Sequence, residues 1–216
     1  MSHKMNQILK KLEPDRKGFD SDPIGYSSLA WHKWGLAQAI AGFPVDLENP
    51  PSPEDLNSPV LWLSHAHAMA EAGKHVILNE PDTSFFPKTL TGVCDSQYCA
   101  VGLMLVAYSL EIALKAMLVI KKGVAEYLAD PKKHQHHRLV DLAQFIPNLT
   151  AKDRAILQAL SHFSHWAGRY PDPGPRKEKH AQEVLRLAEQ HQITANQLFS
   201  LTARVMGYAQ KLVNEE

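Results

Sequence analysis

Residues 99–123 read CAVGLMLVAYSLEIALKAMLVIKKG, and this stretch decides the fold of the chain. Between residues 100 and 120, the side chains that are not apolar are Gly102, Ser109, Glu111 and Lys115. A helix that is apolar almost all the way round lies either at the centre of a helical core or across a membrane. Its length permits a membrane span, but an ionised side chain at mid-bilayer costs roughly 2.5–3.5 kcal/mol, so Glu111 and Lys115 oppose one. The stretch therefore predicts the central helix, at about 99–122, of an all-α, up-and-down helical bundle that has no membrane partner.

The composition narrows the class of protein. A chain of 216 residues suits one domain with a substantial core and an extension. Its 23 basic and 23 acidic residues balance, so the strongly basic character typical of nucleic-acid-binding proteins is absent, although a local basic patch is not excluded. Cys94 and Cys99 have neither the spacing of a C-x-x-C site nor that of a disulfide framework. With no apolar segment of signal-peptide length at the N-terminus, we expect a cytoplasmic protein with reduced cysteines.

A proline-rich segment predicts the domain boundary. Residues 43–59 carry a proline-rich linker, FPVDLENPPSPEDLNSP. Before it we expect helices at about 4–13 and 27–41, so residues 1–57 form an N-terminal extension of helices and loops. Ser58 and Pro59 then supply an N-cap and a first helical residue, which start the bundle proper, residues 58–216.

Smaller signals predict local structure within the bundle. Thr150 and Asp153 have the spacing of a capping box at a helix start, and Gly123 suits the end of the central helix. We expect the KKHQHH segment at 132–137 to be a solvated basic loop. Phe85 and Phe86, in an irregular segment, are expected to pack on the core.

Glu111 and Lys115 lie four residues apart, with Glu on the N-terminal side, which favours an ion pair along the helix. One interpretation is a polar cleft that binds an anionic or hydrogen-bonding partner. The other is a structural pair at the one solvated edge of the helix.

The twelve histidines raise the question of a metal. His162 and His165 share a helical face, but no H-E-x-x-H motif or obvious three-ligand set is present. G-x-S-x-G, P-loop and G-x-G-x-x-G motifs are absent too. The sequence therefore predicts no metal and no cofactor.

Arg169 and Tyr170 follow an apolar helix directly. An arginine and a tyrosine together can hold a phosphate and stack a base. Alternatively, Arg169 caps the last carbonyl groups of the helix and Tyr170 covers the core.

Three pieces of sequence occur in an order and at spacings that resemble the HEPN superfamily: AYSLEIALKAML at 107–118, HHRLVDL at 136–142 and WAGRYPDP at 166–173. HEPN proteins are small helical bundles that include RNA-cutting toxins, phage-defence components and non-catalytic nucleotidyltransferase partners. The resemblance covers roughly residues 58–215. It implies an up-and-down bundle that forms a homodimer with a functional cleft. It also implies family-like positions for Glu111 on the second helix, His137 before the L-x-x-L turn and Arg169 in the R-Y-P element.

Ribonuclease members of this superfamily carry an Arg followed, after four to six residues, by a His. Arg186 and His191 fit this pattern. Five steps along a regular helix turn by about 140°, so the two side chains converge only if the helix ends near Gln190.

Three functional hypotheses remain. The first is a non-enzymatic HEPN-like module that binds RNA, a nucleotide or a protein partner through a cleft near Glu111, Lys115 and Arg169. The second is a metal-independent ribonuclease, in which Arg186 stabilises the charge of the transition state and His191 transfers protons or orients the 2′-hydroxyl. The third is a helical scaffold without a cleft.

Overall fold

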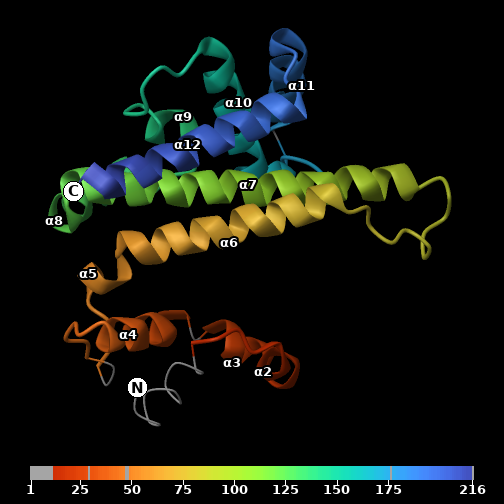
Figure 1. The fold of residues 1–216 in the computed structure, drawn as a ribbon. Helices are drawn as coiled ribbons and strands as arrows, with labels where there is room; N and C mark the ends of the chain where they lie inside the picture. Colours follow the sequence, from red (N-terminus) through yellow and green to blue (C-terminus); the bar gives the residue numbers. More distant parts are fainter. Residues whose placement is uncertain (1–11, 29, 47–48, 176, 216) are drawn as a thin grey trace. The chain divides into compact units, whose positions relative to one another are not determined.

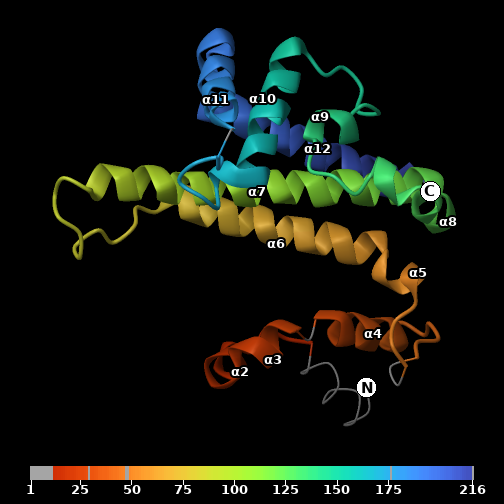
Figure 2. The ribbon, with the colours of Figure 1, turned by 180° about the vertical axis from the view of Figure 1, so that it is seen from behind.

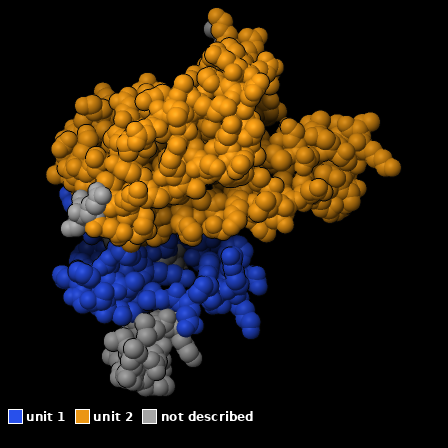
Figure 3. Space-filling view, turned by 45° about the horizontal axis from the view of Figure 1, so that its top comes forward, with its two compact units in different colours: residues 1–56 blue, residues 57–216 orange. Residues whose placement is uncertain are grey.

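A computed structural model describes residues 12–28, 30–46, 49–175 and 177–215. Every regular element in these ranges is helical and none is a strand, which confirms the all-α bundle. The helix expected over 4–13 lies almost wholly outside them. Two compact units divide the chain, residues 1–56 and 57–216, coloured separately in Figure 3.

The first unit consists of short helices. They are α2 (Arg16–Ser21), α3 (Pro23–Ser28), α4 (Ala30–Ile40) and α5 (Pro53–Leu56). The ring of Phe19 meets that of Tyr26 edge-on at 5.8 Å, and Lys33 Nζ lies 4.4 Å from the centre of the Tyr26 ring. The helix expected over 27–41 corresponds to the end of α3 and the whole of α4.

The second unit contains the long helices. In chain order it comprises α6 (Pro59–Leu78), α7 (Thr91–Lys122), α8 (Val124–Ala129), the 3₁₀ turn η1 (Pro131–Lys133), α9 (Leu139–Leu142), α10 (Ala151–His162), the π-helical turn η2 (Phe163–Ala167), α11 (Glu178–His191) and α12 (Ala195–Glu215). Figures 1 and 2 show α6 antiparallel to α7, with α12 along α7 and with α10 and α11 on the opposite side of α7 from α6.

The central helix is longer than the sequence predicts. It begins at Thr91, before the expected start near Cys99, and ends as expected at Gly123, which has a positive φ of 77°. Its buried residues include Leu110, Leu114 and Met117, each with no exposed surface. By length and composition α7 could span a membrane, yet 61% of its most apolar window is buried within the protein. The apolar run is thus the centre of the core of this unit.

Glycines allow close contacts along α7. A Cβ atom at Gly102 would lie 2.5 Å from Cγ1 of Ile77, so α6 and α7 meet where this side chain is absent. On another side, η2 brings Gly168 against α7, where a Cβ atom would lie 2.3 Å from Cβ of Met104. Small residues therefore set how closely two segments approach the central helix.

A capping box starts α10, as predicted. Asp153 N donates to Thr150 Oγ1 at 3.1 Å, and Thr150 N donates to Asp153 Oδ2 at 2.8 Å. Arg204 of α12 also pairs with the same Asp153 oxygen at 2.7 Å, so the cap joins two helices.

Two local predictions are wrong. Phe85 and Phe86 are 88% and 48% exposed, because the longer α7 carries their loop to the end of the α6–α7 pair, beyond the core. The 132–137 loop is not solvated throughout, because His134 is only 7% exposed and stacks on Tyr127 at 5.1 Å.

Candidate functional site

A pocket of about 790 Å³ opens in the second unit between the segment before α9, the end of α10 and α11. Five of the twelve histidines line it, together with one arginine. These pocket residues are His136, His137, Arg138, His162, His165 and His180. We call this cavity the histidine pocket. The imidazoles and the guanidinium therefore supply several N–H groups that can donate hydrogen bonds to a ligand.

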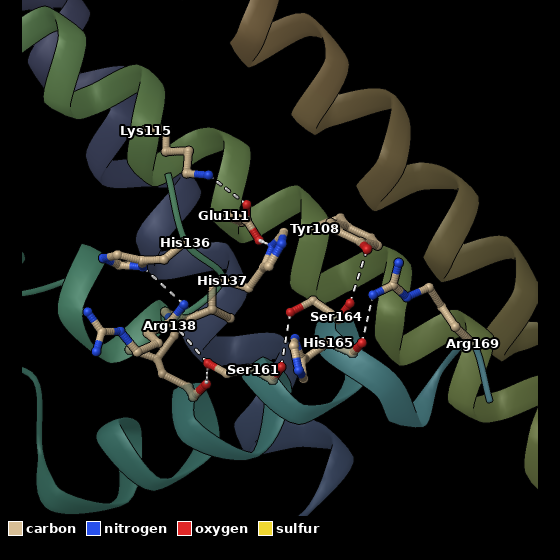
Figure 4. A network of polar contacts seen from close by, with 12 residues as sticks. Tyr108, Glu111, Lys115, His136, His137, Arg138, Ser161, Ser164, His165 and Arg169 are labelled. Atoms are coloured by element: carbon tan, nitrogen blue, oxygen red, sulfur yellow. Dashed lines mark hydrogen bonds and ion pairs between the residues drawn. The ribbon is translucent and has the colours of Figure 1, made fainter. Parts of the chain in front are cut away.

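Behind the pocket, α7 presents a polar face within its apolar surface. Tyr108, Glu111 and Lys115 lie at helical spacing on this face. The side chain of Glu111 is only 6% exposed, and its Oε1 accepts from Lys115 Nζ at 2.7 Å. Its second oxygen, Oε2, lies 2.8 Å from Nδ1 of His137 (Figure 4). Glu111 therefore joins the ammonium group to an imidazole of the pocket.

This contact fixes the proton arrangement on His137. An ionised carboxylate only accepts hydrogen bonds, so Nδ1 of His137 is the donor. In the neutral imidazole the other nitrogen, Nε2, is then an acceptor. The His137 side chain is 46% exposed and lines the histidine pocket, and Nε2 has no hydrogen-bond partner within the described residues. A buried carboxylate thus orients an accessible base.

The π-helical turn η2 contributes His165 to the wall of the histidine pocket. The hydroxyl of Tyr108 donates to the carbonyl oxygen of Ser164 at 3.0 Å, which ties η2 to α7 (Figure 4). The Tyr108 ring meets the His137 ring edge-on at 6.2 Å, and the His165 ring lies 6.4 Å from that of His137. The turn therefore brings a second imidazole close to the oriented one.

Ser161 has a structural role in the pocket. Its hydroxyl donates to the carbonyl oxygen of Leu157 at 2.8 Å and accepts from the backbone N–H of Leu139 at 3.0 Å. The bond from Leu139 holds the start of α9 against α10, and the bond to Leu157 lies within α10. With its proton engaged, this hydroxyl is not a free nucleophile.

His162 and His180 face each other at the other end of the pocket. Trp166 Nε1 donates to His162 Nδ1 at 3.3 Å, so a neutral His162 carries its proton on Nε2. The two imidazole rings lie 5.6 Å apart, and Nδ1 of His180 is buried without a hydrogen-bond partner in the described structure. This end of the pocket therefore offers the Nε2–H donor of His162 and the unpaired Nδ1 of His180.

The pocket favours neutral imidazoles. Burial lowers the pKa of His136, His162 and His165 below the usual 6.5, because the charged form loses hydration. Nearby positive charge lowers each pKa further: Arg138 acts on His136, His180 on His162, and Lys177 on His165. An anion in the pocket would stabilise the protonated form of these rings.

The structure confirms the predicted ion pair of Glu111 and Lys115 and adds His137 to it. Arg169 and Tyr170 do not line the histidine pocket. Arg169 Nη2 donates to the carbonyl oxygen of His165 at 2.7 Å, which matches the capping alternative. Tyr170 is 59% exposed, so it does not cover the core.

Arg186 and His191 are not brought together in the pocket. Arg186 donates to Glu183 at 2.8 and 3.0 Å and to Gln190 at 2.5 Å, all within α11. His191 is the last residue of that helix. The guanidinium of Arg186 therefore contacts residues of its own helix.

Sequence reasoning missed the roles of Tyr108, Arg138 and His180. The tyrosine was hidden among the apolar residues of α7, and the other two lie on segments that meet only through the fold. Two sequence signals did point to residues of the pocket: the common face of His162 and His165, and the family-like position of His137. Among the described residues, no group of three or more His, Cys, Asp or Glu is arranged to hold a metal ion.

No family model, curated protein or solved structure matches the chain. The resemblance to HEPN proteins therefore rests on the three sequence elements alone. Two of them, residues 107–118 and 136–142, supply Glu111 and His137, which the fold brings into contact.

Proposed function

We propose that residues 57–216 form a HEPN-like helical module that binds RNA or a nucleotide in the histidine pocket. One observation supports this most strongly: Arg138 and five imidazoles line a single cavity of about 790 Å³. That volume lies in the range typical of small-molecule pockets, roughly 300–1,000 Å³. In line with the resemblance, we propose that the module is a cytoplasmic homodimer.

The side chains of the pocket suit a phosphate group. Arg138 Nε pairs with Asp141 Oδ2 at 2.8 Å, and no hydrogen bond within the described residues uses its two terminal amino groups. A guanidinium presents such groups in a planar fork that matches phosphate oxygens. The surrounding imidazoles add donors and flat rings on which a base can stack.

Arg138→Gln is expected to weaken RNA binding at least tenfold, because a charge-assisted hydrogen bond contributes roughly 1.5–3 kcal/mol and about 1.4 kcal/mol corresponds to a factor of ten in Kd. The measurement is fluorescence anisotropy with a labelled single-stranded RNA, followed by competition with a mononucleotide. Arg154→Gln is the matched control, since Arg154 is an exposed arginine of α10 outside the pocket. Equal losses in both variants, or no binding of either ligand, would contradict the proposal. Purification with a stoichiometric protein partner and no nucleic acid would favour the protein-binding alternative instead.

RNA affinity is expected to rise as pH falls from 8 to 6 at constant ionic strength. The pKa values of His136, His162 and His165 are below 6.5 in the free protein. A phosphate favours the protonated rings, so binding takes up protons and strengthens as protons become available. Phosphodiesters stay ionised in this range, so the ligand does not cause the change.

The same low pKa values have the opposite effect on folding. The unfolded chain binds protons at these histidines more readily than the folded one, so their contribution to stability is complete above pH 6.5 and is lost as pH falls. The anisotropy series is therefore paired with circular dichroism at each pH. An affinity that does not change from pH 8 to 6 would contradict proton-coupled binding.

A further inference from the structure

We propose that Glu111 and His137 act as a base dyad that removes the 2′-hydroxyl proton of RNA bound in the histidine pocket, so that the RNA is cleaved without a metal ion. This inference rests on the proposed binding of RNA. It assigns the chemistry to α7 and to the loop before α9. It does not use Arg186 and His191 of α11.

The geometry is that of an oriented general base. Oε2 of Glu111 lies 2.8 Å from Nδ1 of His137, and Lys115 holds the other carboxylate oxygen at 2.7 Å. The carboxylate fixes the Nδ1–H tautomer and stabilises the imidazolium that forms when Nε2 takes up a proton. His137 is the residue that meets the substrate, while Glu111 is a positioning residue behind it.

The surroundings hold this imidazole in place. The Tyr108 ring packs edge-on against it, and the hydroxyl of that tyrosine is fixed to Ser164. Two residues further along the chain, Leu139 N is bonded to Ser161 Oγ, which anchors the backbone after His137. A base held on both sides is suited to proton transfer.

The pocket offers a base but no nucleophile of its own. The proton of the Ser161 hydroxyl is engaged by Leu157, and Cys94 and Cys99 do not line the cavity. In the part of the chain that the structure describes, no group of three or more His, Cys, Asp or Glu is arranged to hold a metal ion. Such a site suits a substrate that carries its nucleophile beside the bond to be broken. RNA does so, because its 2′-hydroxyl adjoins the 3′-phosphodiester.

The reaction balances with two imidazoles. Nε2 of His137 takes the proton from O2′ as the bond from O2′ to phosphorus forms. The bond from phosphorus to O5′ breaks, and O5′ takes a proton from the imidazolium of His165, whose ring lies 6.4 Å from that of His137. The products are a 2′,3′-cyclic phosphate and a 5′-hydroxyl. Arg138 stabilises the charge on the non-bridging oxygens during the transfer.

The experiment measures binding and cleavage of the same labelled single-stranded RNA by the full chain in EDTA. We expect cleavage with 2′,3′-cyclic phosphate ends. A strand with 2′-deoxyribose at the cleavage position is expected to bind equally and to remain intact. His137→Gln is expected to slow single-turnover cleavage about 100-fold or more with less than about threefold change in Kd. His65→Gln, an exposed histidine of α6, is the matched control and should cleave at the wild-type rate.

Glu111→Gln tests the dyad itself. A glutamine can offer its oxygen to Lys115 and its amide N–H to Nδ1 of His137, which forces the proton onto Nε2 and removes the acceptor. We expect cleavage to fall about 100-fold or more while Kd is retained. The double variant with His137→Gln should be no slower than His137→Gln alone, because the two groups act as one unit. A purely structural role would alter binding or give additive losses.

Each contrary result is distinct. If RNA binds but the wild type leaves it intact, the dyad is wrong and the binding function stands. If RNA does not bind, both proposals fail. Unchanged cleavage by His137→Gln, or cleavage that EDTA abolishes, also overturns the dyad. Loss of cleavage in His191→Gln but not in His137→Gln would assign the reaction to α11.

Discussion

Glu111→Ala is expected to lower the free energy of unfolding by about 3–5 kcal/mol, the range for breaking a buried ion pair from one side. The Glu111 side chain is 6% exposed and that of Lys115 is 14% exposed, so the ammonium group would remain largely out of water without its partner. His137 would lose its hydrogen bond as well. Urea denaturation, with the slope of each transition compared, measures the loss.

The control is an exposed ion pair of the same residue types. Glu71 Oε2 lies 3.6 Å from Lys74 Nζ on α6, and both side chains are more than half exposed. Surface pairs of this kind contribute roughly 0–1 kcal/mol, so Glu71→Ala should barely alter the urea midpoint. Similar losses in the two variants would mean that Glu111 does not stabilise the core through Lys115 and His137.

Gly168→Ala is expected to destabilise the protein by about 3 kcal/mol, the upper part of the range for overpacking. The added Cβ would lie 2.3 Å from Cβ of Met104 and 2.9 Å from the carbonyl oxygen of Ala100. Neither atom is the free end of a flexible side chain, so η2 must move away from α7. Because η2 carries His165, the variant should also bind RNA less tightly. Thermal unfolding and anisotropy measure the two effects.

Gly207→Ala provides the opposite expectation. Gly207 lies within α12, and nothing would come within 4 Å of its Cβ. Alanine favours a helix over glycine by roughly 0.5–1 kcal/mol, so this variant should be slightly more stable than the wild type. If Gly168→Ala behaved in the same way, the close contact between η2 and α7 would be wrong.

Local sequence signals predicted the elements whose causes are local. The apolar run gave the central helix, the spacing of Thr150 and Asp153 gave a cap, and four-residue spacing gave the pair of Glu111 and Lys115. In each case the interacting groups lie within a few residues of one another. Helical geometry alone then determines whether they meet.

The site could not be predicted in the same way. His137 is 26 residues from Glu111 along the chain, and only the packing of the loop before α9 against α7 joins them. His180 reaches the pocket from α11. The prediction that Phe85 and Phe86 pack on the core was wrong, because their apolar character does not show that α7 begins at Thr91 and carries the preceding loop beyond the core. The HEPN resemblance pointed to Glu111 and His137 separately and gave no contact between them.

The π-helical turn has a consequence for comparing this chain with others. A ring closed from residue i to i+5 holds one residue more than an ordinary α-helical turn. A homologue with a regular turn at residues 163–167 would therefore be one residue shorter here. An ungapped alignment would then pair Arg169 or His165 with a residue of the homologue that is one position away from the true counterpart. Residue correspondences on the two sides of this turn should be assigned independently, with a single-residue gap allowed between Ser161 and Gly168.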